Sequence, residues 1–81
     1  MTRIYVVTIA ERIKLPEKKE KGIVIEPALD TWRTASHTVA VVDGWADSAI
    51  SKAMELRNAA ENADKIVERH ALSVVLTGEA E

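Results

Sequence analysis

The chain has 81 residues, a formal net charge of −2, 47% hydrophobic and 30% charged residues, and no cysteine. This length corresponds to one domain over residues 1–81, with no room for a large buried active site, and the lack of cysteine excludes disulfides, cysteine zinc sites and thiol catalysis. The apolar runs are short and the N-terminus has no signal-peptide pattern, so we expect a cytoplasmic protein that does not cross a membrane.

Residues 2–10 are mostly β-branched or aromatic and predict a first strand. Apolar side chains fall on both of its faces, with Tyr5, Val7 and Ile9 opposite Ile4 and Val6, which is typical of a central strand. The alternation continues weakly to Leu15, and the proline that follows ends the element.

Three further segments precede the expected helix. Residues 16–22 have turn composition and predict a hairpin loop, and residues 22–26 predict a short second strand. Residues 28–35 are compatible with a turn, a bulge or the start of the next strand, and the sequence does not decide between them. Residues 36–42 alternate again and predict a third strand.

After Asp43-Gly44 the apolar period changes to that of a helix, which we expect to begin between Asp43 and Asp47. Its end is open between residues 60 and 69, because neither glycine nor proline interrupts the pattern. Residues 71–77 predict a last strand and residues 78–81 a frayed acidic tail. The order β-β-β-α-β indicates an α+β fold in which one principal helix covers one face of a small, antiparallel-rich sheet.

Catalytic chemistry has few candidates in this chain. His37 and His70 would share a metal or acid–base site with Asp43 or Asp64 only if the third and last strands were neighbours. Ser36 directly precedes His37, and adjacent strand residues point to opposite faces, so the two cannot form a nucleophile–base pair. The glycines match no phosphate-binding loop. We therefore expect no enzymatic activity, no cofactor and no bound metal.

The charge is unevenly distributed along the chain. Residues 12–21 carry a local net charge of +3, whereas the remaining residues carry −5. The five basic residues of this segment are Arg12, Lys14, Lys18, Lys19 and Lys21. A protruding basic loop can bind an acidic protein surface or phosphates. The pI near 5.7 and the absence of RNP, KH and helix-turn-helix patterns argue against nucleic acid.

The two tryptophans lie beside predicted loops rather than inside apolar stripes. We expect Trp45 to belong to the core and to fasten the start of the helix to the sheet. Trp32 has polar neighbours, among them Arg33, and is the better interface candidate because tryptophan is enriched at binding hot spots.

In size and element order the chain is similar to small proteins encoded by phages and mobile elements, including some anti-CRISPR inhibitors. This resemblance involves no residue motif and assigns no site. We expect a non-enzymatic protein-binding module, an inhibitor or adaptor, that presents the basic loop 12–21 and the Trp32 region to a larger protein. The alternative is a nucleic-acid-binding domain that uses the same loop. The alanine-rich helix, the second sheet face and an edge strand such as residues 22–26 also predict a homodimer.

Overall fold

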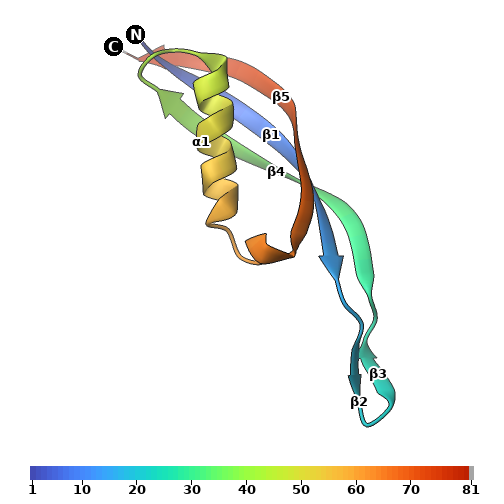
Figure 1. Ribbon diagram of the computed structural model, residues 1–81. Coiled ribbons are helices and arrows are strands. Elements are labelled where there is room, and N and C mark those ends of the chain that lie inside the picture. The colour runs from blue at the N-terminus through green and yellow to red at the C-terminus, as the bar shows by residue number, and fades with distance from the viewer. Residues whose placement is uncertain (81) are drawn as a thin grey trace.

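The computed structural model describes residues 1–80 and shows a three-stranded antiparallel sheet with one helix on one face (Figure 1). This arrangement confirms the α+β fold predicted from the sequence. The sheet has the strand order β4-β1-β5, so the first strand is central, and a separate two-stranded hairpin joins β2 to β3. The elements are β1 (Thr2–Leu15), β2 (Lys18–Glu20), β3 (Ile23–Glu26), β4 (Leu29–Val41), α1 (Ala46–Asn58), the 3-10 helix η1 (Ala63–Lys65) and β5 (Ile66–Ala80).

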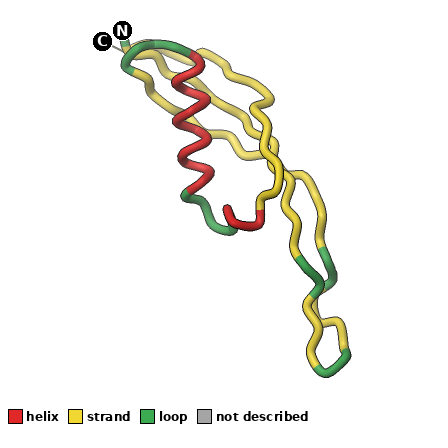
Figure 2. Tube along the Cα trace, viewed as in Figure 1, coloured by secondary structure: helices red, strands yellow, loops and turns green. Residues whose placement is uncertain are grey.

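The molecule is long and narrow, with dimensions of 60 × 18 × 15 Å. Figures 1 and 2 show the reason: the hairpin of β2 and β3 continues the β1–β4 pair well beyond the sheet and the helix. Residues 16–28 form this projection, which we call the arm. The arm ends in a turn at Lys21 and Gly22, both of which have positive φ angles, as in a type I′ hairpin turn.

The strands are longer than the sequence predicts. The undecided segment 28–35 belongs mostly to β4, which pairs with β1 without a register shift from Leu29 to Val41. The predicted loop 16–22 contains β2. In both segments a paired strand stabilises residues whose own sequence is weakly patterned, because cross-strand pairs rather than intrinsic propensity stabilise a sheet.

The helix is shorter than the range left open by the sequence, and the last strand is longer than expected. α1 ends at Asn58, and the chain then reverses through Asn62, which has a left-handed backbone with φ 63°. β5 begins at Ile66 and continues to Ala80, so the prediction of a frayed tail is wrong for residues 78–80; Glu81 lies outside the described residues. Pairing with β1 as far as Thr2 keeps these residues in the sheet.

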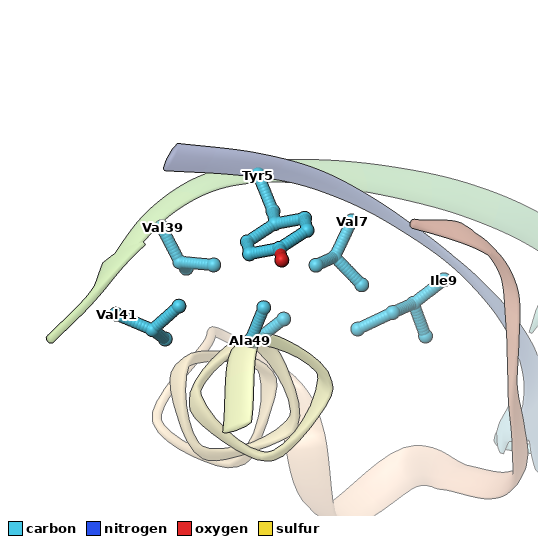
Figure 3. Packing of buried hydrophobic residues seen from close by; sticks show 7 residues of the cluster. Tyr5, Val7, Ile9, Val39, Val41 and Ala49 are labelled. Carbon is cyan, nitrogen blue, oxygen red and sulfur yellow. The ribbon is translucent and has the colours of Figure 1, made fainter. Parts of the chain in front are cut away.

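The core lies between α1 and the covered face of the sheet, by which we mean the face on which α1 packs (Figure 3). Ala49 and Ala53 are fully buried, and their small side chains let the helix lie close to the strands. Ile50 and Met54 pack beside them. The sheet contributes the buried residues Tyr5, Val7, Ile9, Val39 and Val41. Little apolar area is therefore buried per residue, as expected for a domain of this size.

The prediction that Trp45 belongs to the core is wrong, because this side chain is 69% exposed. Polar contacts hold the start of α1 instead. The Tyr5 hydroxyl donates to the Gly44 carbonyl at 2.7 Å, and Asp43 accepts the Trp45 N–H at 2.8 Å and the Ser48 hydroxyl at 2.6 Å. Gly44 has φ 73°, and a Cβ there would lie 3.1 Å from the Met1 carbonyl oxygen, so this turn requires glycine.

We expect Ile9→Ala to lower the free energy of unfolding by about 2–5 kcal/mol, because Ile9 is fully buried and its loss leaves a cavity. The matched control is Ile23→Ala in the arm, where the side chain is 67% exposed and the expected change is within about 0.5 kcal/mol. Urea denaturation of both variants measures the difference. Equal effects would contradict the assignment of the core to the helix-covered part of the sheet.

Candidate functional site

The structure distributes the predicted partner-binding residues over three places. The side chains of Arg12, Lys14 and Trp32 lie at positions of the sheet face opposite α1, which we call the open face. Arg33 is next to Trp32 in β4 and therefore points to the covered face. Lys18, Lys19 and Lys21 belong to the arm, where every residue is exposed. The seven residues do not form one continuous patch.

The arm exposes apolar side chains as well as lysines. Ile23, Val24 and Ile25 in β3, and Leu29 at its base, are all between 43% and 67% exposed. An isolated two-stranded hairpin is only marginally stable in water. The arm therefore exposes apolar side chains that a binding partner could contact, and no other part of the described chain packs on them.

The positive charge of segment 12–21 is largely compensated across the strands. Lys18 is opposite Glu26 in the β2–β3 register, and Arg12 donates two hydrogen bonds to Asp30, at 2.6 and 2.7 Å. Residues 12–30 together hold five basic and four acidic side chains. The sequence shows the basic run but not the acidic residues that pairing brings beside it: segment 12–21 alone carries +3, whereas residues 12–30 together carry +1.

Trp32 lies on the open face, stacked on His70 of β5 with ring centroids 5.8 Å apart and planes at 25°. Ala10 of the central strand is opposite His70 in the register, and it is buried although α1 does not cover this face. A small residue at this position leaves room for the two rings to meet across β1. Trp32 is still 49% exposed, so it presents a large ring surface held in place by its neighbour.

The rest of the open face is uncharged toward the helix-bearing end. Thr8 of β1 and Ser36 of β4 share a hydrogen bond of 2.9 Å, and Val6 lies next to Thr8 on the same face of β1. Val75 of β5 is opposite Val6 and is 52% exposed. The predicted two-sided apolar character of β1 is therefore real, but within residues 1–80 no second layer covers this face.

The covered face carries a charge cluster that the sequence analysis missed. Glu11 has an exposed fraction of 0%, and its carboxylate accepts hydrogen bonds from Arg57 at 2.7 and 3.1 Å and from Arg69 at 3.0 Å. Arg33 forms an ion pair at 3.5 Å, and Arg69 also donates to Asn58 at 2.6 Å. Glu11 continues the odd-numbered series of Tyr5, Val7 and Ile9 along β1. This period of two indicates that Glu11 shares their buried face.

Burial alone would raise the pKa of Glu11, but the hydrogen bonds and positive charges of Arg57 and Arg69 outweigh it and hold this pKa below its usual range. The cluster is structural in character. Arg57 and Arg69 already donate to the carboxylate, and Glu11 is inaccessible to a reactant.

The two histidines do not meet. His37 is on the covered face of β4 and His70 is on the open face of β5, with β1 between the two strands. Among residues 1–80 no three His, Asp or Glu side chains are grouped as metal ligands, and no helix is both long and apolar enough to span a bilayer.

Comparison of the chain with protein-family models, with curated proteins and with solved structures finds no significant match. The functional inference therefore rests on the geometry of the arm, the Trp32–His70 stack and the sheet surfaces.

We expect Glu11→Gln to lower the free energy of unfolding at neutral pH by about 3 kcal/mol, because the arginines lose their buried counter-charge. The folded-state pKa of Glu11 is depressed, so its contribution is present above the unfolded-state pKa, roughly 4.3, and is lost as pH falls through the folded-state pKa. Wild type and variant should converge in acid.

The matched control is Glu79→Gln, which removes an exposed ion pair with Arg3 and should change the stability by at most about 1 kcal/mol. Urea denaturation between pH 7 and pH 3 provides the measurement. A stability difference for Glu11→Gln that stayed constant over this range would show that folding does not lower the pKa of the Glu11 carboxyl.

Proposed function

We propose that this protein is a non-enzymatic protein-binding module, an inhibitor or adaptor, that docks on a larger protein through the arm and the neighbouring Trp32. The proposal rests on the large accessible surface area of the protein. The accessible area is 5633 Å², whereas a compact monomer of this mass has about 4,800 Å². The excess of about 800 Å² equals one partner's share of a standard protein–protein interface.

The composition of this surface favours a protein over a nucleic acid. A nucleic-acid site needs uncompensated basic side chains along the phosphates, whereas Lys18 of the arm lies opposite Glu26 and Arg12 beside the arm forms an ion pair with Asp30. A phosphate backbone offers no apolar surface on which the exposed Ile23 and Ile25 side chains could pack. They suit an apolar groove whose rim carries both signs of charge, which is the usual composition of a protein interface.

Trp32 supplies the anchor next to the arm. Its ring is already immobilised against His70, so binding there costs little side-chain entropy, and large aromatic residues with exposed faces dominate binding energy when a partner buries them. Arg33 does not belong to this surface, because it contacts Glu11 on the other face.

Shortening the arm tests the proposal directly. Replacement of residues 16–28 by Asn-Gly joins Leu15 to Leu29, which already face each other in the register, through a two-residue hairpin turn. All the removed residues are exposed, so we expect the unfolding free energy to stay within about 0.5 kcal/mol of wild type. Thermal and urea denaturation measure this. A large loss of stability would show that the arm supports the fold.

Affinity capture from the source cells after nuclease treatment then compares wild type with three separate variants. These are the shortened arm, Trp32→Ala and the double reversal Lys18→Glu with Lys19→Glu. We expect one protein to bind wild type and to be lost with the shortened arm and with Trp32→Ala. The charge reversal should mainly slow association, as rim charges do. The exposed Val42→Ser is a matched control that should bind normally. Capture that occurs only without nuclease treatment and falls steeply with salt would contradict the proposal and support the alternative.

A further inference from the structure

The two outer strands of the sheet differ in regularity. β5 has three register shifts against β1, at which Val67, Leu72 and Thr77 have no partner in the register. Such bulges disrupt an edge and discourage the addition of another strand. β4 pairs with β1 over all 13 of its residues without a shift. Its outer edge is therefore regular as well.

The direction of the free backbone groups on β4 follows from one hydrogen bond. The Lys52 ammonium donates to the Ala40 carbonyl at 2.8 Å from outside the sheet, so the backbone groups of Ala40 point away from β1. In an antiparallel strand alternate residues share this direction. The N–H and C=O groups of Trp32, Thr34, Ser36 and Thr38 consequently also point outward.

This edge lacks the usual protection. Residues 34–41 contain no Asp, Glu, Lys, Arg or Pro, the residues by which proteins commonly block strand addition. The Lys52 side chain reaches over the edge at Ala40. Along the edge, between β4 and α1, lies a groove of about 350 Å³ with the half-exposed Leu56 on its wall. The groove is lined by Val39, Ala40, Lys52, Glu55, Leu56 and Ala59.

We propose that the outer edge of β4 is the dimer interface of this protein, where a second copy adds its own β4 antiparallel and continues the sheet to six strands. A second copy fits because it brings the same unprotected edge and the same groove. The alternate outward groups of the two strands satisfy each other, and the two half-exposed Leu56 side chains lie on the same face of the joined sheet.

The direction of α1 fixes how the two helices lie in the dimer. α1 runs antiparallel to β4, since Lys52 lies near Ala40 at one end of the strand and Arg57 meets Arg33 at Glu11 near the other. A twofold axis at the middle of β4 therefore places the two helices antiparallel. The incoming strand takes over the Ala40 carbonyl that Lys52 occupies in the single chain.

Amide hydrogen exchange tests the edge without a mutation. The N–H groups of Thr34, Ser36, Thr38 and Ala40 should exchange rapidly in dilute protein and slowly in concentrated protein, in step with a mass of twice 8.9 kDa by light scattering. Their neighbours Ala35 and His37, which bond to β1, should be protected at both concentrations. A chain that remains at 8.9 kDa at high micromolar concentration overturns the proposal.

Substitutions on the edge and on the open face locate the interface. Thr38→Pro removes one outward N–H without touching the β1 ladder and should weaken the dimer about tenfold or more, whereas Thr38→Ala keeps the donor and should not. Val75→Lys on the open face is the control and should leave the dimer intact. A dimer lost with Val75→Lys but kept with Thr38→Pro would place the contact on the open face and refute the edge. Circular dichroism verifies that each variant is folded.

Discussion

The carboxylate of Glu11 connects all four long elements of the fold. It projects from the central strand and meets Arg33 of β4, Arg57 of α1 and Arg69 of β5. Taking these charges out of water costs free energy that their attraction offsets only when the hydrogen bonds are well formed. The cluster is therefore more important for geometry than for net stability. An arginine fork accepts few orientations, so it fixes where the end of α1 lies relative to the sheet.

The position of this cluster also explains where the core stops. From Tyr5 to Ile9 the covered face is apolar and packs on Ala49 and Ala53. At Glu11 the packing becomes ionic, and α1 ends one residue after Arg57. Beyond that point only Ile13 of β1 is buried, so the chain continues as paired strands without a second layer. The arm is the continuation of a sheet whose helix has ended.

How much of this could be predicted depends on the range of the interactions. The central strand, the helix start and the α+β class follow from patterns within a few residues, such as the alternation from Ile4 to Ile9, and these expectations hold. The compensation of Lys18 by Glu26 and of Arg12 by Asp30 depends on a register that no local pattern displays. The prediction for Trp45 fails for a similar reason. Tyr5 and Gly44, far apart in sequence, already fasten the helix start, and the indole is left outside.

The two proposals concern different ends of β4 and reinforce each other. Pairing of two β4 strands in antiparallel order points the two arms in opposite directions, because each arm continues its own β1–β4 pair away from the twofold axis (Figure 1). The Trp32 rings lie near the arms, toward the outer ends of the joined strands. A dimer of this shape presents two identical binding surfaces at a fixed separation.

A partner with two matching sites, or two adjacent copies of a partner, then binds the second arm as an intramolecular event, which raises the overall affinity without any new contact. Weak contacts of a single arm are sufficient in such an arrangement, and this agrees with an arm that has no core of its own.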